Sequence, residues 1–281
     1  MVFWNKELLF CEISPTTYAI SVQKEIIKRH LQDFKAKKNF AKTFDTHILP
    51  QLVSSHASGL IKKGPGIDVS LQKNKAINID IASKKMNHIL IRPGEEFSFW
   101  KLVGKITKRH GYLDGRVIMG DKVEPGLGGG LCNLANTINW LIVHSPMDIT
   151  EFHTHSDALA PDGDKRTPLA NGTSVAYNNI DYRFKNNTDQ IVQMLLWCDN
   201  ETLFAELRSE RDFPWIYEIL EEDHHFKKEG QKFYRNSKIY RLKRDKQTDQ
   251  VLEKTLIWDN HSEVMFDYDS IPQELIRDQK S

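Results

Sequence analysis

The chain has 281 residues, 40% of them hydrophobic, so it can bury a core of its own and form one large domain or two small ones. Its 39 lysines and arginines are balanced by 38 aspartates and glutamates, which excludes a strong overall field for nucleic acid, an anionic membrane or an acidic substrate. Any such attraction has to be local. The three cysteines, Cys11, Cys132 and Cys198, are widely spaced and odd in number, which argues against a disulfide framework and a thiolate metal site.

The first thirty residues do not resemble a secretory signal, because acidic residues interrupt their apolar stretch and no small-residue cleavage pattern follows. Nowhere do about 18 apolar residues run together, so no integral membrane segment is predicted. We therefore expect an unexported, soluble and cytoplasmic protein.

Residues 21–42 have the spacing of an amphipathic helix. Apolar side chains recur at steps of three to five residues, and lysines lie between them. The apolar residues are Val22, Ile26, Ile27, Leu31 and Phe34. The basic face of such a helix can contact acidic lipid headgroups, but a solvated face is the commoner explanation of a charge run, and solvation is the prediction here. We assign residues 1–56 to a helical N-terminal segment.

A glycine-proline break at residues 64–66 precedes a segment, residues 75–87, whose apolar spacing favours a helix. Residues 88–100 then predict a strand, a Pro-Gly turn and a second strand in which Phe97 and Phe99 share a face. A hairpin-like segment follows.

Residues 133–144 form the best-marked helix in the sequence, because glycines precede an apolar stripe and Pro146 ends it. A predicted strand at 148–155, a polar loop and further strand-like segments follow. We predict an α+β fold in which an antiparallel sheet packs against helices and a glycine-loop-capped central helix carries Cys132. The main domain is assigned to residues 57–209, and residues 210–281 form a small β-rich tail packed on it.

The junction of the glycine cluster and this helix suggests a function for Cys132. At a helix N-terminus, free N–H groups and the helix dipole favour a thiolate, which would make the cysteine a nucleophile. Gly128, Gly129 and Gly130 would let the backbone adopt positive φ and let a substrate approach, while nearby N–H groups form an oxyanion hole. The alternative is a tight turn with a buried, inert cysteine behind it.

A thiol mechanism also needs a base, and three downstream histidines are candidates. His144 would lie about 18 Å along the helix from its start, too far from Cys132, so it is interpreted as a C-terminal cap. His153 and His155 lie two apart in a predicted strand and therefore point to one face, and Asp157 has the same parity and could orient an imidazole. A polar strand end without a catalytic role is the alternative.

Two binding hypotheses rank below the thiol. The first is a metal site, but an H-x-H pair without a third ligand at a recognised spacing is an unspecific signal. The second is a phosphate or nucleotide at the glycine loop, which matches neither the dinucleotide-binding nor the P-loop spacing. No metal and no cofactor are therefore expected. The metal-ligand types considered are His153, His155, Asp157, Asp162 and Asp164.

Five motifs in order resemble one protein family. They are "IRPGEEFSFWKLVG", "GYLDGRVI", "GGGLCNLANTINWLIVHSP", "HSDALAPD" and "VAYNNIDYRFKNNT", and they resemble the VanW family, named from vancomycin-resistance gene clusters, over residues 57–207. The chain is similar to the short, single-domain members. It departs from the family pattern at Asn133, where the usual motif has glutamine, and at Asn171, which lies near an aspartate found in many long members.

The resemblance implies a link to cell-wall peptidoglycan or glycopeptide resistance. VanW domains of some wall proteins look like cysteine L,D-transpeptidases, which implies a thioester on Cys132 with His155 as the base and His153 as its alternate. The second hypothesis is a non-catalytic module that binds a peptidoglycan precursor or a partner protein in the same cleft. Without export, the stem peptide would have to be that of a cytoplasmic precursor. The residues implied in substrate binding are Gly128, Gly129, Gly130, Asn133 and Asn171.

Overall fold

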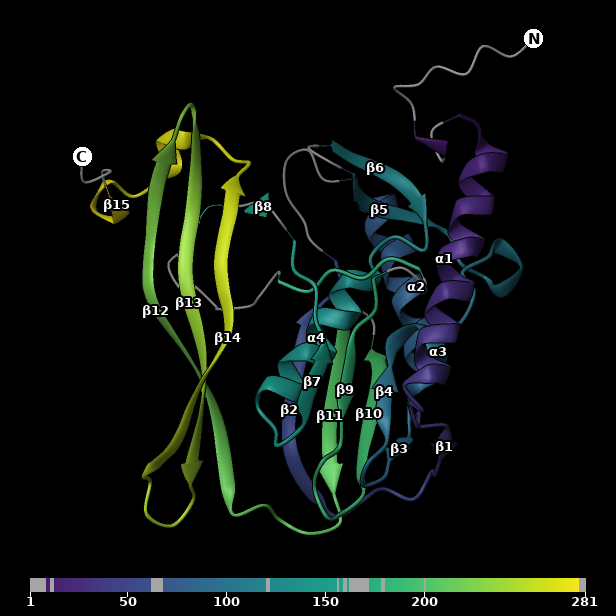
Figure 1. Ribbon diagram of the computed structural model, residues 1–281, viewed down its shortest axis with the longest axis vertical. Coiled ribbons are helices and arrows are strands. Elements are labelled where there is room, and N and C mark those ends of the chain that lie inside the picture. The colour runs from purple at the N-terminus through teal and green to yellow at the C-terminus, as the bar shows by residue number, and fades with distance from the viewer. Residues whose placement is uncertain are drawn as a thin grey trace.

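The computed structural model describes residues 9–10, 13–61, 68–119, 122–155, 157–158, 161, 172–177, 180–199 and 201–277. Its main body is built on a five-stranded antiparallel sheet with the order β1-β3-β10-β11-β2 (Figure 1). The strands are β1 (Thr43–Phe44), β2 (Gln51–Gly59), β3 (Ile89–Ile91), β10 (Val192–Asp199) and β11 (Thr202–Ser209). Alternate residues of β11 are buried, as expected for a strand with one face on a core. The domain boundary predicted at residue 56 falls inside β2, and the domain limits stay a prediction.

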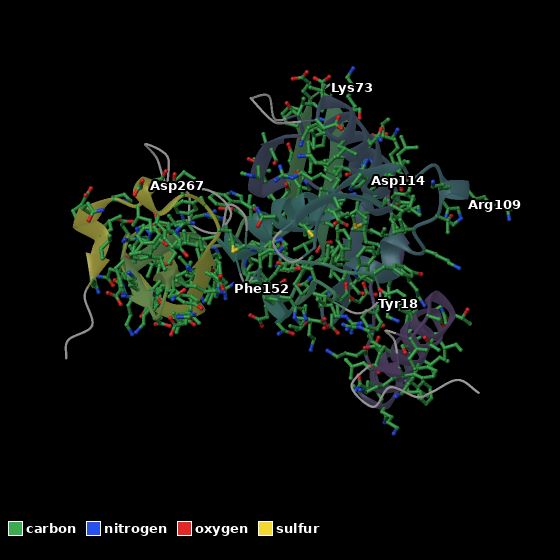
Figure 2. The ribbon with its side chains drawn as sticks, turned by 90° about the horizontal axis from the view of Figure 1, so that it is seen from above. Tyr18, Lys73, Arg109, Asp114, Phe152 and Asp267 are labelled. Carbon is green, nitrogen blue, oxygen red and sulfur yellow. The ribbon has the colours of Figure 1, made fainter. Side chains whose placement is uncertain are left out.

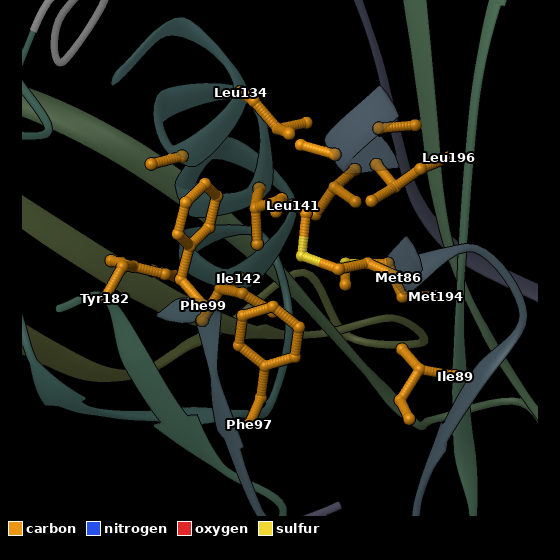
Figure 3. Packing of buried hydrophobic residues seen from close by; sticks show 14 of the residues in the cluster. Met86, Ile89, Phe97, Phe99, Leu134, Leu141, Ile142, Tyr182, Met194 and Leu196 are labelled. Atoms are coloured by element: carbon orange, nitrogen blue, oxygen red, sulfur yellow. The ribbon is translucent and has the colours of Figure 1, made fainter. Parts of the chain in front are cut away.

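Two helices, α2 (Val69–Met86) and α4 (Leu131–Val143), pack against this sheet. Figure 3 shows the buried apolar side chains that they contribute, which meet those of β10 and of the residues around Phe97. The helices predicted at residues 75–87 and 133–144 are confirmed. Each begins earlier than its apolar spacing indicates, and α2 does so because Asp68 caps it by accepting from two backbone N–H groups.

The second strand predicted between residues 88 and 100 ends earlier than expected. β4 (Glu96–Ser98) is followed directly by α3 (Phe99–Val103), because Ser98 Oγ accepts from the N–H of Lys101 at 3.3 Å and caps that helix. β4 pairs with β9 (Arg183–Lys185), which also pairs with β7 (Asp148–Glu151) in a separate three-stranded sheet.

The remaining strands form a hairpin and a second five-stranded sheet, whose three long strands are antiparallel and whose two short edge strands pair in parallel. The hairpin expected after residue 110 is present as β5 (Asp114–Met119) and β6 (Lys122–Leu127). The long strands stand beside the main body, on the side away from α1 (Figure 1). They are β12 (Trp215–Glu229), β13 (Lys232–Asp245) and β14 (Val251–Val264), flanked by β15 (Ile276–Arg277) and β8 (Asp157–Ala158). The fold is therefore α+β with antiparallel sheets, and strands predominate.

α1 (Pro15–Lys35) is attached to the main body through a buried ion-pair network. Arg183, only 5% exposed, pairs with both carboxylate oxygens of Asp33 at 2.6 and 3.1 Å and donates from Nε to Asp181 at 2.7 Å. Burial alone would raise the pKa of Asp33, but the hydrogen bonds and charge of Arg183 outweigh it, so that pKa is lowered. The Asp33 carboxylate is thus ionised at neutral pH and compensates the buried guanidinium.

The turn that leads into α4 is held by Asn78 of α2. Its Nδ2 donates to the carbonyl oxygens of Leu113 and Gly129, both at 3.0 Å, and its Oδ1 accepts from the N–H of Leu113 at 2.8 Å. Asn78 is fully buried, so these bonds form away from water. A Cβ at Gly129 would lie 2.4 Å from the carbonyl carbon of Gly115, so glycine is required there by the close approach of the β5 backbone.

We predict that Arg183→Met lowers the free energy of unfolding by about 3–5 kcal/mol, because the buried carboxylates of Asp33 and Asp181 lose their closest cation and keep only the longer pairs with Lys101 at 3.5 Å and Arg29 at 3.9 Å. Urea unfolding at neutral pH, followed by circular dichroism, measures the loss. Arg211→Met is the control, since Arg211 pairs with Asp189 on the exposed surface, where an ion pair contributes about 0–1 kcal/mol. Equal losses in the two variants would contradict a stabilising role for the buried network.

We predict that Gly129→Ala lowers the free energy of unfolding by about 1–3 kcal/mol, because the new methyl group overlaps the backbone of Gly115 and the turn has to shift. The same urea experiment tests it. Gly59→Ala is the matched control, because no atom lies within 4 Å of a Cβ built at Gly59. A Gly129→Ala variant as stable as Gly59→Ala would show that the turn has room for a side chain.

Candidate functional site

Cys132 lies in the first turn of α4, two residues after Gly130. Gly130 has a left-handed φ of 103°, and no side chain caps the helix. The N–H of Asn133 donates to the carbonyl oxygen of Gly130 at 2.9 Å. The Cys132 side chain packs against the hydrophobic core, and its thiol donates to the carbonyl oxygen of Val175 at 3.6 Å.

Burial raises the pKa of the Cys132 thiol, and the hydrogen bond to Val175 offsets only part of this effect. The helix N-terminus favours a thiolate, but here desolvation outweighs it. The resting side chain is therefore a protonated thiol, which agrees with the alternative of a buried cysteine and differs from the thiolate of the nucleophile hypothesis. Cys198 is a second free cysteine, and burial raises its pKa to about 11.

The residues around His155 are paired with the segment that contacts Cys132. The N–H of His155 donates to the carbonyl oxygen of Gly172 at 3.2 Å, and the N–H of Ser174 donates to that of His153 at 2.8 Å. This short ladder continues into Val175, the acceptor of the thiol. Three segments that are distant in sequence are thus neighbours at the start of α4.

The three histidines have different surroundings. Nδ1 of His144 donates to the carbonyl oxygen of Trp140 at 2.8 Å at the end of α4, so its interpretation as a C-terminal cap is confirmed. His153 is exposed, and its Nε2 lies 3.1 Å from a carboxylate oxygen of Glu151. His155 is half-buried in the ladder.

The strand predicted over residues 148–155 is shorter in the structure. β7 ends at Glu151, and beyond it only Thr154 forms a bridge, with Thr173. Asp157 belongs to β8, which pairs in parallel with β14, so its backbone joins a different sheet from the histidine segment. The sequence placed Asp157 on the same strand face as His155 on the assumption of one continuous strand, and the structure does not have that strand. Asn171, Asp162 and Asp164 lie outside the described residues.

Polar side chains of α4 line the contact with this ladder. Asn136 follows Cys132 by four residues and lies on the same helix face, and its Oδ1 accepts from the hydroxyl of Thr173 at 3.2 Å. The Oδ1 of Asn133 is buried and accepts no hydrogen bond from the described residues, while its Nδ2 lies 3.4 Å from Ser58 Oγ. The sequence analysis overlooked Asn136, although its i+4 spacing from the cysteine was a usable signal.

The three glycines of the turn are packed by the chain itself. Gly128 and Gly130 have positive φ angles of 76° and 103°. A Cβ at Gly130 would lie 2.0 Å from Cγ of Lys75, and a Cβ at Gly128 would lie 2.6 Å from Cγ2 of Ile106. These close contacts and positive φ angles explain why glycine is required at these positions, without a role in substrate binding.

Within the described part of the chain, no group of three or more His, Cys, Asp or Glu side chains is arranged to hold a metal ion. None of the helices in the same residues is both long and apolar enough to cross a membrane.

The part of the chain that contains Cys132 and the histidine segment is similar to known proteins. Residues 74–208 match the family model described as VanW like protein. The chain is 26% identical over 227 residues to the vancomycin B-type resistance protein VanW of Enterococcus faecalis, which covers 81% of this chain and 82% of that protein. It is also 26% identical over 121 residues to the uncharacterized protein YoaR of Bacillus subtilis, which covers 43% of this chain and 38% of that protein.

No solved structure matches the chain. The matched residues 74–208 include Asn78, the glycine turn, Cys132 and the His153–His155 ladder, so the features described above lie in the region that the family shares. The match to the family model and the similarity to VanW along most of both sequences agree, and the chain belongs to the VanW family.

Proposed function

We propose that this protein acts on peptidoglycan stem peptides or their precursors in glycopeptide resistance, by acyl transfer through Cys132. The similarity to a vancomycin B-type resistance protein supports the biological role. The reaction class is supported by one observation: the thiol of Cys132 contacts Val175, and the segment that ends at Val175 is paired with the segment of His155. A nucleophile and a base from distant parts of the sequence are thus carried by neighbouring segments.

In the proposed reaction, Cys132 Sγ attacks the carbonyl carbon of a stem-peptide amide while His155 accepts the thiol proton. The C–N bond then breaks, and His155 returns the proton to the leaving amine, which leaves a thioester on Cys132. An acceptor amine attacks the thioester and restores the thiol. Because the resting thiol is protonated, the proton transfer belongs to the attack step and a preformed thiolate is not required.

The remaining residues take supporting roles in this proposal. N–H groups at the uncapped start of α4 stabilise the oxyanion, and the glycine turn that precedes them sets their direction. Asn133, the residue after the nucleophile, is a proposed substrate-binding residue through its side-chain amide. His153 is the alternate base, and Asp157 is the proposed orienting acid. With the proposed cytoplasmic localisation, which cell fractionation tests, the substrate is a precursor and not the mature wall.

A non-catalytic binding module is the second candidate, and the burial of the thiol favours it. Desolvation of Cys132 raises its pKa and so lowers the fraction of reactive thiolate. In that case the start of α4 would hold a peptidoglycan precursor without cleaving it. Reactivity and turnover measurements separate the two candidates.

We predict that Cys132 reacts with iodoacetamide at pH 7 more slowly than the thiol of glutathione, because only the thiolate reacts and burial raises the pKa. The rate should rise about tenfold per pH unit until the pH reaches that pKa. The measurement uses a Cys11→Ser, Cys198→Ser background, with labelling followed by mass spectrometry. A rate above that of glutathione at neutral pH would instead indicate a helix-stabilised thiolate.

We predict that Cys132→Ser lowers the rate of acyl transfer between soluble stem peptides and an amine acceptor by about 10³-fold or more, while peptide binding measured by calorimetry is retained. Cys198→Ser is the matched control and should keep both properties, because Cys198 lies on β10 and not at the start of α4. Undiminished turnover by the Cys132→Ser variant would exclude the thioester.

The same assay tests the base. His155→Gln should lower kcat by about 10²–10⁴-fold if His155 transfers the proton. His153→Gln tests the alternate base. His153 is exposed beside Glu151, so the proposal expects this variant to lower kcat far less, and a larger loss than in His155→Gln would assign the proton transfer to His153. Binding without turnover in the unsubstituted protein would favour the binding module.

A further inference from the structure

The outward face of α1 is apolar and exposed. Ile20, Ile27, Leu31 and Phe34 are 53%, 58%, 54% and 82% exposed, and Ile13 just before the helix is 42% exposed. Their spacing places them along one face of the helix. Figures 1 and 2 show α1 at the margin of the molecule, on the side away from β12, β13 and β14. An apolar helix face of this kind on a folded protein marks an interaction surface.

The opposite face of α1 forms ion pairs with the rest of the protein. Asp33 pairs with Arg183, and Arg29 pairs with Glu151. The hydrophobic core clusters of the described residues include no residue of α1. Two apolar residues on this side, Val22 and Ile26, are half-buried. Most of the large apolar side chains of α1 nevertheless lie on the outward face, whereas an ordinary surface helix packs its apolar face on the core. Ion pairs hold it in this orientation and direct its apolar face outward.

Basic residues border the apolar face. Lys24, Lys28 and Lys35 lie three or four residues from Ile20, Ile27 or Leu31 and so flank these side chains on the helix surface. All three lysines are exposed. Residues 15–42 contain seven lysines and arginines but only two acidic residues, in a chain whose charges otherwise nearly balance. One of those two, Asp33, is already paired with the buried Arg183.

We propose that α1 is an interfacial membrane helix, which binds the surface of an anionic bilayer with its apolar face in the acyl region and its lysines at the headgroups. An apolar stripe bordered by lysines complements such a surface in both hydrophobicity and charge. The helix binds in the plane of the interface, since it is not apolar enough to cross a membrane. This proposal is independent of the chemistry at Cys132.

A second copy of the chain is a poorer fit to the same face. Ile13, Ile20, Ile27 and Phe34 recur every seven residues. The second seam position would be occupied by Thr16, Gln23 and His30 in one register and by Thr17, Lys24 and Leu31 in the other, and of these only Leu31 is apolar. Two-stranded coiled coils require apolar residues at both seam positions. A pair of α1 helices would also bring their lysine rows together.

Co-sedimentation of the full chain with vesicles tests the proposal. Vesicles of equal parts phosphatidylglycerol and phosphatidylcholine should bind the protein, pure phosphatidylcholine vesicles should bind it far more weakly, and added salt should release it. Replacing Lys24, Lys28 and Lys35 together with glutamine should weaken binding to the anionic vesicles by about a hundredfold. No binding to anionic vesicles by the unsubstituted chain would overturn the proposal.

The apolar contribution is tested with a matched pair of double variants. Ile27→Gln with Leu31→Gln should weaken vesicle binding by about tenfold or more, since glutamine keeps the helix but removes the apolar side chains. Leu252→Gln with Leu256→Gln on β14 is the control, because these leucines are similarly exposed, at 52% and 46%, away from α1. Circular dichroism checks that both variants fold.

Analytical ultracentrifugation without lipid distinguishes the competing occupant. The proposal expects the Ile27→Gln, Leu31→Gln variant to have the same oligomeric state as the unsubstituted chain. A dimer that this variant dissociates, together with equal vesicle binding by the variant and the control, would assign the face to a second copy and overturn the membrane assignment.

Discussion

The geometry of the candidate site depends on the buried side chain of Asn78. Its three hydrogen bonds join α2 to the start of the β5–β6 hairpin at Leu113 and to the turn before α4 at Gly129. The absent side chains of Gly115 and Gly129 let the two backbone segments touch at the same place. Because Cys132 follows this turn by three residues, its position relies on the amide of a helix far away in sequence.

Helix α2 shows what the sequence could and could not predict. The apolar spacing of residues 75–87 identified the helix, because that spacing is local. The role of Asn78 is not readable from spacing, since a polar residue on a helix is usually solvated and its partners here lie 35 and 51 residues away. The same limit applies to β3 and β4, which are neighbours in sequence but belong to different sheets.

At the candidate site, the sequence predicted correctly what depends on helix geometry, but it did not predict the burial of Cys132. The length of the helix excluded His144 as the base for Cys132, and in the structure His144 caps the C-terminal end of α4. The helix dipole predicted a favoured thiolate at Cys132, whereas burial raises the thiol pKa. A sequence supplies the dipole but not the degree of desolvation, which depends on Val175 and the core packed around the thiol. For α1 the spacing predicted an amphipathic helix, but over residues 21–42, whereas the helix begins at Pro15, after the Ser14 cap, and ends at Lys35. A charge run also does not reveal that the apolar face points outward.

Glu151 contacts both helix α1 and the histidine segment near Cys132. Its carboxylate pairs with Arg29 on α1, accepts from the N–H of Asp181 at 3.1 Å and lies 3.1 Å from Nε2 of His153. Glu151 is also the last residue of β7, from which the chain enters the histidine ladder. One carboxylate therefore contacts both the outward-facing helix and the histidine segment, in addition to the pair of Asp33 with Arg183 that also holds α1. The ion pair with Arg29 thus connects α1 to the end of β7, from which the chain continues into the segment that carries His155.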